Sequence, residues 1–180
     1  VMASGMGMPS IGIYSYELFN FFDVDNIIRI GSAGGMCDKV KVRDIVIAQG
    51  ACTTSRYSHT FNLPGEFAPI SDFTVLRTLV EKSEELGIKY EVGNVLSSDV
   101  FYGDTPELSA NWQKMGVLAV EMEAAALFMN AARAGKKAGA LFTISDHLVT
   151  GESLPAIERQ NSFTDMMKLA LETAVELENK

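Results

Sequence analysis

The chain has 180 residues, 47% of them hydrophobic, and carries a formal net charge of −8 at pH 7. This length and composition suit one globular domain, residues 1–180, with a single buried core, and they exclude disordered and collagen-like chains. The acidic balance and the lack of any Lys or Arg run argue against a nucleic-acid-binding protein, because basic residues supply the affinity for nucleic-acid phosphates.

Short apolar runs alternate with amphipathic stretches, which is typical of an α/β domain. We therefore expect a mixed, largely parallel central sheet flanked by helices. Because the chain opens directly in the apolar Val1-Met2-Ala3, we expect the end of a buried strand there and an N-terminal strand that is missing from the sequence. The elements predicted next are a helix from Pro9 to about 23, strands at 26–31 and 44–48, a helix from 71 or 72 to 86, and a strand at 88–97.

The second half of the chain continues this alternation. Pro106 suits the first turn of a helix, where its missing N–H is not needed. The elements predicted here are a helix from Pro106 to about 116, a strand at 117–121, a helix rich in small residues at 124–134, a strand at 137–145, and one final helix from about 156 to 177.

The segment Ile-Arg-Ile-Gly-Ser-Ala-Gly-Gly, residues 28–35, ends a predicted strand with features of an anion site. In an open α/β sheet, ligands bind beyond the carboxyl ends of the strands. Arg29 supplies a planar cation, Ser32 a hydroxyl, and the glycines allow close backbone approach. A structural ion pair of Arg29 is the alternative, but an unpaired charge in a buried strand is costly, which favours an anionic ligand. The glycine spacing is not that of a dinucleotide site.

Two further segments place acidic side chains at the ends of predicted strands. Glu121 and Glu123, in Val-Glu-Met-Glu-Ala-Ala-Ala, can accept hydrogen bonds from a vicinal diol such as ribose, although carboxylates that stabilise a helix N-terminus are the preferred interpretation of this segment alone. Asp146 ends an apolar strand, where desolvation would favour the protonated form that a general acid needs. Capping is the alternative for Asp146, and a hydrogen-bonded loop residue is the preferred interpretation of His147.

Taken together, these segments resemble the bacterial-type hexameric purine nucleoside phosphorylases. The resemblance rests on four motifs in the family's order across the chain, namely Ser-Gly-Met-Gly-Met-Pro-Ser, Ile-Ile-Arg-Ile-Gly-Ser-Ala-Gly-Gly, Val-Glu-Met-Glu-Ala-Ala, and Ser-Asp-His followed by Glu-Arg-Gln. It implies phosphorolysis of purine nucleosides to the free base and ribose 1-phosphate. It also implies that the family's first strand and glycine-rich phosphate loop precede Val1.

The resemblance implies a role for each matching residue. Phosphate would be bound by Arg29, Gly31 and Ser32. Asp146 would protonate purine N7 with the help of Arg159. The residues expected around the nucleoside are Met6, Phe101, Val120, Glu121, Met122, Glu123 and Ser145.

The partners expected are purine nucleosides and phosphate, with no nucleic acid and no membrane. No metal or organic cofactor is expected, since inorganic phosphate is a co-substrate. The family resemblance implies a homohexamer, a trimer of dimers, whose sites are completed by a neighbouring subunit. No apolar run approaches the roughly 18 residues that a membrane helix needs, no signal segment opens the chain, and Cys37 and Cys52 lack metal-ligand spacing, so we expect a cytoplasmic protein.

Three other functions remain open at this point. A uridine phosphorylase would share the phosphate and ribose motifs, but the Ser145-Asp146 pair favours a purine. A methylthioadenosine-type hydrolase needs no phosphate, and Arg29 argues against it. A non-catalytic nucleoside-binding module is the alternative from a different class.

Overall fold

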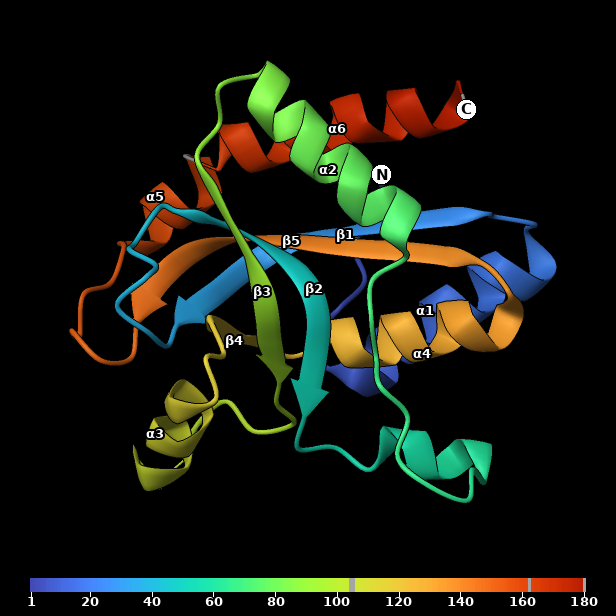
Figure 1. Ribbon diagram of the computed structural model, residues 1–180, viewed down its shortest axis with the longest axis horizontal. Coiled ribbons are helices and arrows are strands. Elements are labelled where there is room, and N and C mark those ends of the chain that lie inside the picture. The colour runs from blue at the N-terminus through green and yellow to red at the C-terminus, as the bar shows by residue number, and fades with distance from the viewer. Residues whose placement is uncertain (104–105, 162, 180) are drawn as a thin grey trace.

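Five strands form a sheet that closes on itself, and helices cover it on two sides (Figure 1). The computed structural model describes residues 1–103, 106–161 and 163–179. The strands are β1 (Asn26–Gly35), β2 (Ile45–Thr53), β3 (Tyr90–Ser97), β4 (Ala119–Glu121) and β5 (Lys137–His147). The helices are α1 (Met8–Phe21), the 3-10 helix η1 (Tyr57–Phe61), α2 (Phe73–Glu85), α3 (Pro106–Lys114), α4 (Ala124–Ala134), α5 (Ala156–Asn161) and α6 (Thr164–Glu178).

The strand order around the sheet is β1-β4-β3-β2-β5. Parallel pairs join β1 to β5, β2 to β3 and β3 to β4, whereas β1 with β4 and β2 with β5 are antiparallel. The predicted mixed, largely parallel sheet is therefore confirmed. The sheet is also closed, because the short β4 pairs with β3 on one side and with Gly34 and Gly35 of β1 on the other.

The helices divide into two layers, with α1 and α4 on one side of the sheet and α2 and α6 on the other (Figure 1). The first layer packs on a large apolar cluster centred on Phe128 and Phe142, and the second on a cluster around Leu79 and Leu169. This burial explains the helical spacing of apolar residues in the sequence. Asp72 begins α2 as predicted, because its carboxylate accepts hydrogen bonds from two backbone N–H groups of the first turn, at 2.9 and 3.1 Å.

Two predicted elements differ from the structure. The single final helix is divided into α5 and α6, because the buried side chain of Phe163 packs into the core while its backbone (φ −89°, ψ 34°) lies outside the helical region. The strand end predicted at 1–3 is not formed. Val1 and Met2 are exposed there, and among the described residues no strand pairs with this segment.

Candidate functional site

Arg29 lies along the inner side of β1 with its guanidinium folded back over Gly31. A Cβ atom on Gly31 would lie only 2.9 Å from Nη1 of Arg29, so the glycine provides the space that the guanidinium occupies. The Arg29 side chain is 11% exposed and also lies over the ring of Phe142, 5.2 Å from the ring centroid. The strand therefore holds a nearly buried cation in one fixed place.

Two carboxylates form ion pairs with this cation. Nε of Arg29 donates to Glu121 at 3.1 Å, and Nη2 donates to Glu123. Nη1 makes one long contact, 3.3 Å, to the carbonyl oxygen of Ile30. A guanidinium has five N–H donors, so part of its capacity remains for an anionic ligand. The predicted phosphate residue and the predicted ribose residue are thus in direct contact.

Glu121 is the carboxylate that stabilises the start of α4. It accepts hydrogen bonds from the backbone N–H of Glu123 at 2.8 Å and of Ala124 at 3.0 and 3.1 Å. The hydroxyl of Ser97 donates to Oε1 of Glu121, the oxygen that the N–H of Ala124 reaches at 3.1 Å. Burial raises the pKa of Glu121, while Arg29 and the hydrogen bonds to the carboxylate oppose that rise. The interpretation preferred from the residues alone, stabilisation of a helix N-terminus, holds for Glu121.

Glu123 has a different environment, although it is the N-cap residue of α4. Its side chain makes no capping hydrogen bond to that helix. Instead it accepts the backbone N–H of Gly7 at 2.6 Å and the Nη2 of Arg29. Gly7 has φ 86° and ψ 158°, a conformation that is essentially restricted to glycine. The loop before α1 and strand β1 therefore meet at the Glu123 carboxylate.

Asp146 lies near the end of β5, beside the last residues of β1. A Cβ atom added to Gly34 would lie 3.2 Å from Oδ2 of Asp146 and 3.3 Å from Cγ1 of Val120, so all three residues are close together. Ser145 donates a hydrogen bond to Asp146 at 2.7 Å. The Asp146 residue is partly exposed, so the apolar surroundings expected for it are incomplete.

The other predicted residues lie nearer the solvent. Arg159, in α5, is exposed and its Nε donates to the carbonyl of Leu154 at 3.0 Å. Within the described ranges, no ion pair joins Arg159 to Asp146. Met6 and Phe101 are 80% and 70% exposed. Ser32 is exposed, and Met122 is partly buried.

His147 has a structural role, in agreement with the preferred interpretation. It is buried, its Nε2 lies 3.1 Å from the carbonyl oxygen of Cys37, and its Nδ1 accepts the N–H groups of Val149 and Thr150 at 3.2 and 3.3 Å. Both ring nitrogens are therefore occupied, Nδ1 by the turn after β5 and Nε2 by the carbonyl of Cys37.

Two polar contacts at this site were not predicted from the sequence. Ser97 bonds to Glu121, and the backbone N–H of Gly7 bonds to Glu123. A single serine at a strand end has no distinguishing pattern. For Gly7 a signal existed, since two glycines before Pro9 indicate an unusual backbone at a helix start.

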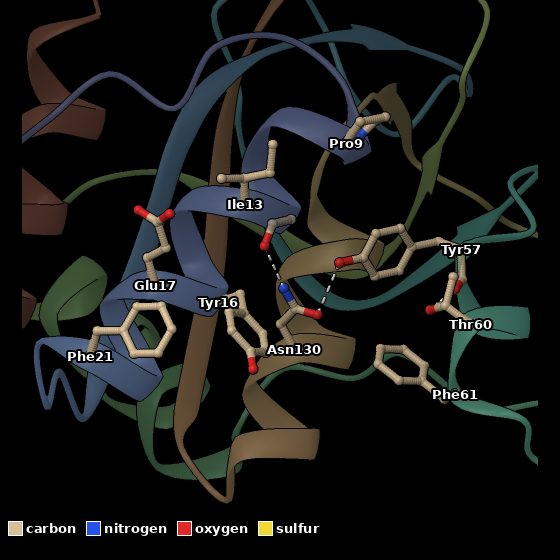
Figure 2. A pocket seen from close by; sticks show the side chains of 10 residues that line it. Pro9, Ile13, Tyr16, Glu17, Phe21, Tyr57, Thr60, Phe61 and Asn130 are labelled. Carbon is tan, nitrogen blue, oxygen red and sulfur yellow. Dashed lines mark hydrogen bonds between the residues drawn. The ribbon is translucent and has the colours of Figure 1, made fainter.

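A cavity among the described residues lies elsewhere. It has a volume of about 480 Å³ and lies between α1, η1 and the side of α4 (Figure 2). Its wall includes Tyr57, whose hydroxyl donates to Asn130 at 3.0 Å, and Phe61. The predicted site residues do not line it. In the described ranges, no His, Cys, Asp and Glu cluster fits a metal ion, and no helix combines the length and apolarity needed to cross a membrane.

Comparison with known proteins agrees with the motifs. The sequence model of the phosphorylase superfamily matches residues 1–177. The chain is 48% identical over 175 residues to a protein of Tolumonas auensis named purine nucleoside phosphorylase DeoD-type, covering 97% of this chain and 74% of that protein. Proteins of the same name from Clostridium beijerinckii and Caldanaerobacter subterraneus are 48% identical over 179 residues and 47% over 174 residues. The match to the Clostridium protein covers 99% of this chain and 76% of that protein. The match to the Caldanaerobacter protein covers 97% of this chain and 75% of that protein.

The motifs, the fold and the similarity over nearly the whole of this chain agree. The chain belongs to the phosphorylase superfamily and, within it, to the family of DeoD-type purine nucleoside phosphorylases.

Proposed function

We propose that the protein cleaves purine nucleosides with inorganic phosphate. A phosphate oxygen attacks C1′ of the sugar, the glycosidic bond breaks, and the products are the free purine and ribose or deoxyribose 1-phosphate. The observation that carries this proposal is the nearly buried Arg29 guanidinium, held beside Glu123 over a glycine backbone. The relatives named purine nucleoside phosphorylase support the choice of reaction.

Phosphate would bind to the N–H groups of Arg29 that its two carboxylates leave available. Gly31 adjoins the guanidinium, and the exposed Ser32 follows it on the same strand. As the glycosidic bond breaks, positive charge develops on the sugar, and a bound phosphate stabilises it. Arg29 would thus hold the nucleophile in place for the attack.

The sugar would lie at Glu123, with Met122 and Met6 packed beside it. A carboxylate offers about four acceptor positions, and Gly7, Arg29 and the N–H of Met122 at 3.2 Å already use three of them. The ribose hydroxyls would therefore share or replace one of these donors. Glu121, occupied with α4 and Arg29, would line the site without holding the sugar.

Asp146 would act as the general acid at purine N7, with Ser145 orienting its carboxyl group. The electron pair of the broken bond passes to the purine, and the proton from Asp146 leaves the base neutral. Phe101 and Val120 would border the base. Arg159 would approach mainly as the proton is transferred, because a permanent ion pair would favour the carboxylate. We expect Arg159→Ala to lower kcat more than it raises KM, and a change in KM alone would contradict this role.

We also propose a homohexamer built as a trimer of dimers, by family resemblance. Two exposed apolar side chains of α1, Ile13 and Phe21, line the cavity in Figure 2 and would suit a subunit contact. Sedimentation of the purified protein tests this proposal. A monomeric mass would contradict it.

The central experiment measures release of free base from inosine, adenosine and uridine, with and without phosphate. Phosphate-dependent release from the purine nucleosides, greatly slowed in Asp146→Ala but not in the exposed control Asp165→Ala of α6, is the expected result. Release without phosphate would mean a hydrolase, and a preference for uridine would mean a pyrimidine enzyme. Binding of inosine without turnover would favour a non-catalytic module.

A further inference from the structure

Ser97 is a buried hydroxyl at the end of β3, directly opposite Glu121 in the register of β3 and β4. Its Oγ donates to one carboxylate oxygen of Glu121 and accepts the backbone N–H of Ala125 at 2.9 Å. The Ser97 backbone is held from β2, because the hydroxyl of Thr53 donates to its carbonyl oxygen at 2.9 Å. The position and the direction of the hydroxyl are thus determined from both sides.

The hydroxyl of Ser97 acts on the carboxylate that holds Arg29. Without it, that oxygen of Glu121 would retain one contact, the N–H of Ala124 at 3.1 Å. The other oxygen accepts the Nε of Arg29 at 3.1 Å and the backbone N–H groups of Glu123 and Ala124 at 2.8 and 3.0 Å. Without the Ser97 bond the carboxylate would be held mainly at this second oxygen, so it could tilt about that oxygen and change the direction in which it accepts the Nε of Arg29.

The same hydroxyl supports the charge on Glu121. Burial raises the pKa of this carboxyl group, and the nearby Glu123 carboxylate acts in the same direction. Arg29 from β1 and Ser97 from β3 oppose them. Removing the Ser97 hydroxyl would favour the protonated form, which pairs less well with the Nε of Arg29.

We propose that Ser97 is a positioning residue for phosphate binding, which acts through Glu121 on the orientation of Arg29. The proposal rests on the proposed function, because it takes phosphate as the ligand of Arg29. Ser97 touches neither substrate, so its removal should affect phosphate affinity more than nucleoside affinity or turnover. A role in stability alone would lower the unfolding temperature and leave the phosphate affinity unchanged.

The test compares Ser97→Ala with Ser83→Ala. Ser83 is an equally buried serine of α2 whose hydroxyl donates to the carbonyl of Leu79 at 2.7 Å, away from the site. Calorimetry with inorganic phosphate alone should show about tenfold weaker binding for Ser97→Ala and no change for Ser83→Ala. Steady-state kinetics should show the same rise in KM for phosphate, with kcat and the KM for inosine changed much less.

A double-mutant cycle identifies the route through Glu121. If Ser97 acts through this carboxylate, the losses of Ser97→Ala and Glu121→Gln are not additive. Unchanged phosphate affinity in a folded Ser97→Ala protein, or fully additive losses, would overturn the proposal. If Ser97→Ala does not fold, Ser97→Cys takes its place, because its thiol is only a weak donor. This variant should bind phosphate less tightly than the unmodified protein, and undiminished binding would overturn the proposal. Failure of the unmodified protein to bind phosphate would reject the proposed function itself, and with it the role of Ser97.

Discussion

Replacing Gly7 by alanine would test how the loop before α1 supports the proposed sugar site at Glu123. Gly7 has φ 86° and ψ 158°, and from this conformation its N–H reaches Glu123 at 2.6 Å. An added Cβ would meet only Cδ of Pro9, at 3.6 Å, which is an ordinary contact. The cost of the substitution is therefore conformational and amounts to about 1–3 kcal/mol.

The chain can relieve this strain only by turning the Gly7 peptide away from Glu123. A hydrogen bond to a charged group contributes about 1.5–3 kcal/mol, and 1.4 kcal/mol corresponds to a tenfold change in affinity. We therefore expect kcat/KM for inosine to fall roughly tenfold to a hundredfold in Gly7→Ala. The KM for phosphate should change less, because Arg29 keeps its bond to Glu121.

The control for this experiment is Gly135→Ala. Gly135 ends α4 with φ 66°, and a Cβ there would meet no atom within 4 Å, so the substitution also strains the backbone but does so away from the site. Thermal unfolding and steady-state kinetics of both variants separate stability from catalysis. Gly7→Ala and Gly135→Ala should lose similar amounts of stability, but only Gly7→Ala should lose activity. Cleavage of inosine by Gly7→Ala as efficiently as by the unmodified protein would refute the reasoning.

Three further substitutions have separable outcomes. In Gly31→Ala, the new Cβ would lie 2.9 Å from Nη1 of Arg29, so the guanidinium must move. The KM for phosphate should therefore rise about tenfold. Unchanged kinetics would show that Arg29 does not bind phosphate. In Gly12→Ala, the Cβ would lie 2.7 Å from the hydroxyl of Tyr57, and overpacking should cost about 1–3 kcal/mol of unfolding free energy in urea titration, with normal kinetics. Asp72→Ala should lower stability by about 1 kcal/mol through loss of the α2 cap, and an unchanged melting temperature would contradict the capping role.

Much of the fold was predictable because its helices and strands carry local signals. The apolar spacing of α1, α2 and α4 reflects faces buried against the sheet, and Asp72 begins α2 where a cap was expected. The closure of the sheet was not predictable, since it depends on the long-range pairing of β4 with β1. The break at Phe163 was hidden for another reason: its side chain fits the apolar spacing of one continuous helix.

The candidate site shows the same division between local and long-range information. The glycines predicted to leave space beside Arg29 do so at Gly31, but the guanidinium also has two carboxylate partners, the structural ion pair that the strand motif alone disfavoured. Glu121 and Glu123 could not be told apart, because they lie two positions apart at the same helix start. Only the fold shows that one carboxylate serves α4 and Arg29 while the other meets Gly7 and Arg29. The roles of these residues in catalysis stay predictions.

The ion pair between Arg29 and Glu123 bears on the affinity with which the two substrates bind together. If the sugar binds Glu123 and phosphate binds Arg29, as proposed, the two substrates share one pair of charges. A sugar that engages Glu123 would then loosen the hold of this carboxylate on Arg29 and leave the guanidinium freer for phosphate. By thermodynamic linkage, phosphate must then raise the affinity for the nucleoside by the same factor. Each substrate would thus prepare the site for the other, and the enzyme would bind the pair more tightly than the separate affinities predict.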